Sequence, residues 1–306
     1  MIKGLKAAFA AAAMLGGLSA CSESGNGTAA SAETLAIPFN PPLDRALAYR
    51  ISKSETRPGQ PAQPPMSIDF NIRFERAGDG YRMTVTHIVP PALRGAQYAS
   101  MAALLARPIV MRVDGEGNLV SMENEAAYWA SIEQAMAPML EQGGDPRAAA
   151  AARGLLRDMR NMPDEERLAK IGENFVPILG FAGDELARGA SRREPRTVQT
   201  PLGPLNREVV VTIDKVEDGI AYVTSVVTVP PQQMEQAMRQ LLSRLGPDAA
   251  QVAGQLRVLS FEQRERGEVS VETGLARRFE LQRTMEMEAQ GQRGRSTTTQ
   301  TVELVR

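Results

Sequence analysis

The side chains that most often carry nucleophilic or metal chemistry are scarce in this chain. Its 306 residues include one histidine, His87, and one cysteine, Cys21. A catalytic triad has no other imidazole to use, and a metal site cannot be built from a single imidazole. The Gly-x-Ser-x-Gly turn that exposes a nucleophilic serine is also absent. We therefore expect no catalytic residues, no metal site and no cofactor, in a protein that is not an enzyme.

Two patterns have a metal-binding alternative. Thioether sulfur suits Cu(I), and three close methionine pairs occur in the chain, but methionine also fills gaps in apolar cores and the pairs are scattered. Residues 114–118 have the composition of a calcium loop without its closing glutamate, so a hairpin turn explains them better. The methionine pairs are Met136 with Met139, Met159 with Met162, and Met285 with Met287.

His87 lies on a predicted strand whose alternate residues share one face. The functional interpretation is a titrating group in a ligand cavity, whereas the ordinary one is a satisfied histidine near the end of a strand. Trp129, at the start of a predicted helix, would line a groove or pack in the core. The candidate ligand-binding residues are Tyr81, Met83, Val85, His87 and Trp129.

The first twenty residues have the pattern of an export signal. Lys3 and Lys6 supply positive charge, and residues 7–18 are almost entirely apolar. This apolar run is shorter than the roughly 20 residues that a membrane-spanning helix needs. We expect residues 1–20 to be a cleaved signal peptide.

The signal ends in Leu18-Ser19-Ala20-Cys21, and here the chain resembles bacterial lipoproteins, whose lipobox has an aliphatic residue, two small residues and cysteine. The resemblance implies that the Cys21 thiol carries a diacylglycerol, that cleavage occurs before it, and that its amine is acylated. Two or three acyl chains would hold the domain on a membrane. Ser22 in place of an aspartate implies the outer membrane, at its periplasmic face, in preference to the inner membrane.

Composition limits the partners of the mature domain. Without residues 1–20 it has 33 basic residues (35 minus Lys3 and Lys6) against 36 acidic ones, a net charge of −3. This balance does not favour nucleic acid as a partner. With Cys21 lipidated, no disulfide is possible, so the hydrophobic core must hold the fold alone.

The chain divides into five segments by composition. After the signal peptide, residues 21–34 are small and polar and predict a flexible tether. Residues 35–124 form a first β-rich half and residues 195–306 a second. Residues 125–194 predict a helical insert between them, with helices over 126–141, from Asp145-Pro146, and from Pro163 to a break at Pro177.

The two halves have the same predicted order of elements. Strands around 68–74 and 81–89 are followed by Pro90-Pro91, a helix over 92–105 and a hairpin. In the second half the corresponding order is strands, Pro230-Pro231, a helix over 232–245, and a hairpin of 258–264 with 268–271, before the strands 277–288 and 296–305. Two diverged copies of a β-β-α-β-β unit, facing each other across a pseudo-two-fold axis, explain this order; chance similarity remains the alternative.

Together these features predict an α+β fold: a large curved antiparallel sheet with the helical insert packed on its concave face. The architecture loosely resembles the half-barrel lipoprotein carriers and receptors of the bacterial envelope. That resemblance implies a non-catalytic protein that binds an apolar or amphiphilic ligand, such as a lipid, in a cavity between sheet and helices. The alternative is an interaction module that docks an envelope protein partner without any small ligand.

Overall fold

The structure is a computed structural model. It describes residues 34–58, 64–95, 99–142, 153–154, 156–157, 160–179, 181, 185–187, 191–200, 203–244, 251, 254–289 and 291–305. Cys21, the expected signal peptide and the expected tether up to residue 33 lie outside the described residues, as does the helix start expected at Asp145.

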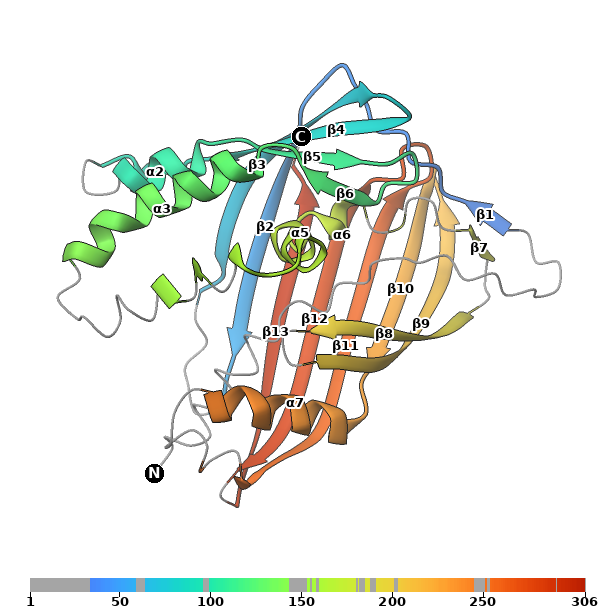
Figure 1. Cartoon of the computed structure of the whole chain (residues 1–306). Coiled ribbons are helices and arrows are strands. Elements are labelled where there is room, and N and C mark those ends of the chain that lie inside the picture. The colour runs from blue at the N-terminus through green and yellow to red at the C-terminus, as the bar shows by residue number, and fades with distance from the viewer. Residues whose placement is uncertain are drawn as a thin grey trace.

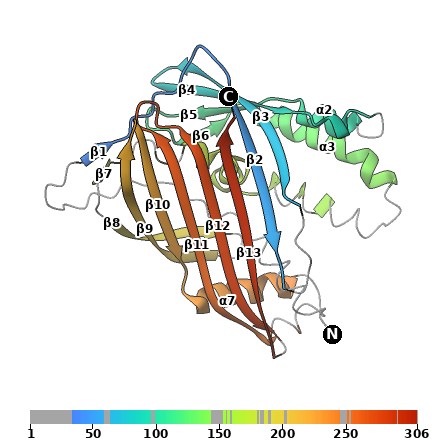
Figure 2. The same ribbon diagram turned by 180° about the vertical axis from the view of Figure 1, so that it is seen from behind.

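Among the described residues, eleven strands form one antiparallel sheet, in the order β6-β5-β4-β3-β2-β13-β12-β11-β10-β9-β8 (Figures 1 and 2). The strands are β2 (Leu47–Thr56), β3 (Met66–Ala77), β4 (Gly80–Ile88), β5 (Ile109–Val113), β6 (Leu119–Met122), β8 (Ser191–Thr200), β9 (Gly203–Glu217), β10 (Ile220–Thr228), β11 (Leu256–Ser270), β12 (Ala276–Ala289) and β13 (Gln292–Leu304). Every neighbouring pair is antiparallel. The fold is therefore α+β with a large antiparallel sheet, as the sequence predicts.

A second, two-stranded sheet and several helices complete the described part of the chain. The small sheet pairs β1 (Thr34–Ala36) with β7 (Glu185–Ala187). The helices are the 3-10 turn η1 (Pro91–Leu93), α2 (Ala99–Leu105), α3 (Glu125–Gln142), α5 (Asp164–Gly172), α6 (Val176–Leu179) and α7 (Pro231–Arg244).

The hairpins β3–β4 and β9–β10 form where the sequence predicts them. In β3, the alternate residues Phe70, Ile72 and Phe74 are fully buried, because a period of two places them on one face of the strand. The turn into β4 contains Gly78 at φ 61°, a left-handed conformation that glycine adopts without steric cost. The corresponding turn between β9 and β10 uses Asp218 and Gly219.

One face of the sheet, which we call the inner face, carries the apolar core. Figure 1 shows α5, α6 and α7 in front of this face, with β8 crossing in front of the central strands. Phe175, Ile178, Leu179 and Phe181, in and around α6, are buried in the same apolar cluster as Phe279 of β12. This segment therefore covers the inner face near one end of the long strands.

A second group of buried apolar side chains lies where α7 packs on β11. Met234 and Met238 of α7 are fully buried, as is Met287 of β12. None of them belongs to the cluster around α6. The described inner face thus carries two groups of apolar side chains, which on β11 and β12 lie toward opposite ends of the strands.

The hairpin expected from residues 258–264 and 268–271 is wrong. These residues form the single strand β11, which pairs along its length with β12. Gly267, which falls in the turn that this hairpin would need between residues 264 and 268, lies inside the strand, and a Cβ added there would be 2.7 Å from Cε2 of Phe181. The glycine therefore makes room for an aromatic ring on the inner face instead of reversing the chain.

The expected helical regions differ from the structure in three places. β7 and the start of β8 lie within residues 185–194, which had been assigned to the helical insert. One helix was expected over 92–105, but the described residues of this range form the 3-10 turn η1 and then the helix α2, which starts at Ala99. The helix from Pro163 breaks earlier than the expected position at Pro177: α5 ends at Gly172, and Pro177 is the second residue of α6, which starts at Val176.

A β-β-α-β-β order occurs twice, as β3-β4-α2-β5-β6 and as β9-β10-α7-β11-β12, but the second segment ends in β11 and β12 and not in the hairpin expected from 258–264 and 268–271. Within the sheet, the first segment runs 6-5-4-3 and the second 12-11-10-9 in the same direction. A two-fold axis normal to the sheet would reverse one of these orders. The segments therefore follow each other along the sheet and do not face each other across such an axis.

Candidate functional site

Two rows of polar side chains cross the inner face between the apolar clusters. Cross-strand partners in an antiparallel sheet share a face, so the register defines each row. We call these residues the polar band. One row runs from Gln263 through Arg283 and Thr298 to Glu55, and the other from Ser225 through Glu265, Leu281 and Gln300 to Lys53, with Leu281 as its single apolar member.

The buried end of the polar band is a hydrogen-bonded chain on β11 and β12. Arg283 donates to Oε1 of Gln263 from Nε (3.1 Å) and from Nη2 (2.8 Å). The Gln263 amide in turn donates to Oε1 of Glu265 at 2.5 Å. Gln263 therefore links a guanidinium to a carboxylate, so that both charges have polar contacts inside the sheet.

Burial dominates the electrostatics of this chain. It raises the pKa of the Glu265 carboxyl, while hydrogen bonding from Gln263 and the charges of Arg207 and Arg283 act in the opposite direction. It also lowers the pKa of Arg283, against the charges of Glu173 and Glu265. Both shifts have the direction that desolvation gives, since a low dielectric disfavours the charged form of each group.

The band becomes progressively exposed toward β2 and β3. Gln263 and Glu265 are buried, Thr298 and Gln300 are half-buried, and Lys53 is exposed. Beyond Lys53, on the same face, Met66 and Ile68 are exposed, while Ile51 is half-buried against the apolar cluster. We call Ile51, Lys53, Met66 and Ile68 the open end of the inner face.

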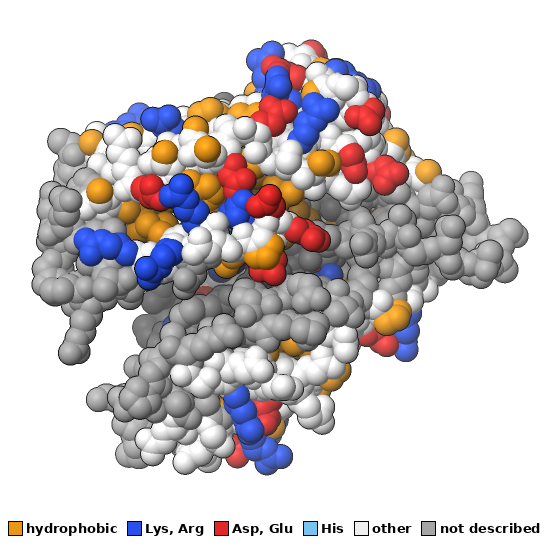
Figure 3. Space-filling view, viewed as in Figure 1, with side chains coloured by type: hydrophobic (Ala, Val, Ile, Leu, Met, Phe, Trp, Pro, Cys, Tyr) orange, Lys and Arg blue, Asp and Glu red, His pale blue; other side chains and the backbone are white. Residues whose placement is uncertain are grey.

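Along β3, the exposure of the side chains changes sharply at the open end. Met66 is 73% exposed and Ile68 is 42% exposed, whereas Phe70, the next residue on that face, is 0% exposed. Figure 3 shows that the molecule is hollowed between its upper and lower parts, in the region where Figure 1 shows β2, β3 and β13 between α5 and α7. The inner face thus continues beyond the helices that cover it.

The candidate residues of β4 lie together on the inner face, and most are core residues. Tyr81, Met83 and Val85 are each at most 2% exposed and belong to the cluster around α6. His87 is half-buried with its ring centroid 6.2 Å from that of Phe70, and burial lowers its pKa. His87 is therefore the member of this group nearest to the open end along the strand.

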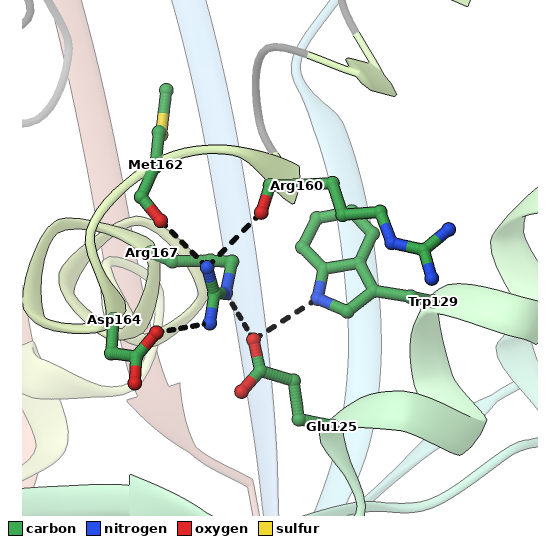
Figure 4. Close-up of polar contacts among 6 residues, drawn as sticks. All are labelled: Glu125, Trp129, Arg160, Met162, Asp164 and Arg167. Carbon is green, nitrogen blue, oxygen red and sulfur yellow. Dashed lines mark hydrogen bonds and ion pairs between the residues drawn. The ribbon is translucent and has the colours of Figure 1, made fainter.

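Trp129 is separate from those four residues and belongs to a polar network between α3 and α5 (Figure 4). Its Nε1 donates to Oε1 of Glu125 at 3.1 Å, and Arg167 donates to the same carboxylate oxygen. Arg167 also donates to the Asp164 carboxylate and to the backbone oxygen of Met162, both at 2.6 Å. Arg167 thus joins α3, α5 and the segment before α5.

The methionine pairs and residues 114–118 are the patterns for which the sequence left metal binding as an alternative. Met285 and Met287 are buried in the apolar cluster beneath α7, while Met159 and the side chain of Met139 lie outside the described residues. The Asp114 carboxylate accepts hydrogen bonds from the backbone N–H of Glu116 and of Asn118 in the turn between β5 and β6. Within the described ranges, no three His, Cys, Asp or Glu side chains gather as a metal site requires.

Sequence reasoning missed the polar band, although β11 contains a signal for it. Phe261, Gln263, Glu265, Gly267 and Val269 are alternate residues, so the strand places two polar side chains in an otherwise apolar series. The expected turn at Gly267 broke this series and concealed it. A single long strand would have placed Gln263 and Glu265 on the buried face.

Comparison with known proteins gives no relative from which to assign a role. No family model matches the chain, and no curated protein matches it either. Among the helices of the described residues, none combines the length and the apolarity that crossing a membrane requires.

Proposed function

We propose that this protein is a lipid-anchored envelope lipoprotein that binds an amphiphile on the inner face of its sheet, without catalysing a reaction. Acyl chains on Cys21 would hold it at the outer membrane, facing the periplasm, and the open end would receive the ligand. The helical insert would pack on the concave side of the sheet, and the two β-β-α-β-β segments would be diverged copies of one unit.

The observation that carries this proposal is the exposure of Met66 and Ile68. Large apolar side chains on the core-facing side of a strand are normally covered, because burying them removes apolar area from water at about 25 cal/mol per Å². Here the same face is closed at Phe70 and open two residues earlier. A ligand with an apolar chain would cover the exposed residues and continue the existing core.

The polar band supports an amphiphile over a purely apolar ligand. Burying Gln263, Glu265 and Arg283 costs desolvation energy that an all-apolar lining would avoid. The band leads from these residues to the open end, so polar and apolar surfaces meet there.

The proposal is tested by asking which lipids accompany the protein. The full-length chain is purified from its native membrane, and non-covalent lipid is extracted with organic solvent, which leaves acyl chains on the protein. We expect close to one lipid per wild-type molecule and several-fold less with Met66→Asp/Ile68→Asp, because a carboxylate on the inner face disfavours an acyl chain.

The matched control is Val120→Asp, since Val120 is 56% exposed on the edge strand β6. It should retain the wild-type amount of lipid. Equal lipid in all three proteins would overturn the proposal. Absence of lipid together with a stoichiometric protein partner would replace it with the docking module.

A further inference from the structure

The open end carries a positive charge whose surroundings differ from those of the other lysines in the body of the chain. Lys170 donates to Glu173 at 2.8 Å and Lys215 donates to Glu217 at 2.5 Å. Lys53 forms no ion pair with any of the described residues, although 33 basic and 36 acidic residues make such pairs common.

The nearest acid on the inner face of the same strand is already engaged. Glu55 binds Arg57 through both carboxylate oxygens, at 2.8 and 2.9 Å. On neighbouring strands, the cross-strand partners of Lys53 are Gln300 and Met66, which carry no charge. Asp69, on β3, lies on the opposite face and pairs with Arg50 at 2.7 Å. The open end is therefore positive.

The position of Lys53 is as informative as its charge. It lies at the junction where the polar band meets the apolar residues of the open end: Gln300 is beside it on β13, and Met66 is opposite it on β3. The next pair along the same face is Ile51 with Ile68. An acyl chain lying over Met66 and Ile68 would place its polar end next to the Lys53 ammonium.

From this juxtaposition we infer that the amphiphile has an anionic head group, a carboxylate or a phosphate, and that Lys53 binds it at the junction of the polar band and the open end. This inference rests on the proposed function and specifies its ligand class. Thr298 and Gln300 supply hydrogen-bonding groups for the remaining polar atoms of the head group. A cationic head group would meet the Lys53 charge and be disfavoured.

The test uses full-length protein reconstituted in phosphatidylcholine vesicles and two photoactivatable probes. One is a long-chain fatty acid with a diazirine on its chain, and the other is the alcohol of the same chain. We expect half-maximal labelling at a roughly fivefold lower concentration for the acid than for the alcohol, because an exposed ion pair contributes up to about that ratio. Labelled peptides should contain Met66 and Ile68.

Lys53→Gln should weaken labelling by the acid roughly fivefold and leave labelling by the alcohol unchanged, whereas Lys53→Arg should retain the preference for the acid. Lys215→Gln is the matched control, because it removes a surface charge at the turn between β9 and β10. The preference should decrease at high salt, since exposed charges are screened. Unlabelled lysophosphatidic acid and unlabelled fatty acid, used as competitors, then distinguish a phosphate from a carboxylate source.

The outcomes separate the two proposals. Equal labelling by both probes in wild type, or an unchanged preference in Lys53→Gln, overturns the anionic head group but leaves amphiphile binding intact. Labelling by neither probe at the open end overturns both proposals.

Discussion

The surroundings of the buried acid Glu265 shift its pKa in opposite directions. Its side chain lies on the inner face of β11, where Gln263 donates to it and two arginines lower its pKa, but burial raises the pKa more. The folded protein therefore binds a proton at Glu265 more tightly than the unfolded chain does. Its contribution to stability should decrease as pH rises above the pKa of the unfolded group.

We predict that Glu265→Gln changes the pH dependence of folding in a defined direction. Between about pH 7 and about pH 5, the free energy of unfolding of the wild type should increase relative to that of the variant, because only the wild type takes up a proton at this position on folding. Denaturant unfolding at both pH values measures the difference. Glu262→Gln, on the exposed face of the same strand, is the control, and an unchanged difference between wild type and Glu265→Gln would contradict the prediction.

At the scale of the elements, the hydrogen-bonded network around Arg167 connects the helices α3 and α5. Arg167 is 13% exposed at its side chain and is shared by the carboxylates of Glu125 and Asp164 and by backbone oxygens before α5. A guanidinium can make these contacts at once because its five N–H groups lie in one plane. The network therefore fixes α3 relative to α5.

We predict that Arg167→Met loosens the helices and spares the sheet. Removing the guanidinium leaves the partly buried Glu125 carboxylate without its cation, which should cost about 1–3 kcal/mol. Hydrogen exchange should accelerate in α3 and α5 but not in β11–β13. Arg160→Met is the control, since that residue forms an exposed ion pair with Glu133. Uniform acceleration across the sheet would instead indicate global destabilisation.

Elements with a strong period could be predicted, whereas those defined by tertiary contacts could not. The alternation in β3 and the glycine turn at Gly78 identified a hairpin, and α3 was expected within one residue of its bounds at each end. β11 was divided because Gly267 resembles a turn residue until Phe181 is placed over it. β8 contains Pro195 and was missed; as an edge strand it tolerates a residue without a backbone N–H.

At the scale of the whole molecule, the proposed membrane anchor is Cys21, which lies outside the described residues. We predict that the wild type incorporates labelled palmitate and that Cys21→Ser does not, because only the cysteine thiol can receive the diacylglycerol. The mature wild-type N-terminus should map to Cys21, and the variant should keep the mass of the precursor. A wild-type protein without covalent fatty acid would contradict the lipid anchor.

The candidate site was less predictable than the fold because it depends on register. The sequence pointed to Tyr81, Met83 and Val85, which pack in the core, whereas the open end is defined by cross-strand neighbours such as Lys53 and Met66. Pairing between distant strands brings Arg283 and Gln300 into the same region. No local pattern contains that information, because a strand does not specify its neighbour.

The position of β13 has a consequence for synthesis of the chain. β13 pairs with β12 on one side and with β2 on the other, so it is the link between β2–β6 and β8–β12 in the large sheet. Because a ribosome makes residues 292–304 after all the other strands, the nascent chain exposes the unpaired edges of β2 and β12 until late in translation. Unpaired edges promote aggregation. A chain truncated before β13 would therefore form two aggregation-prone half-sheets, and would not keep the native fold with one strand missing.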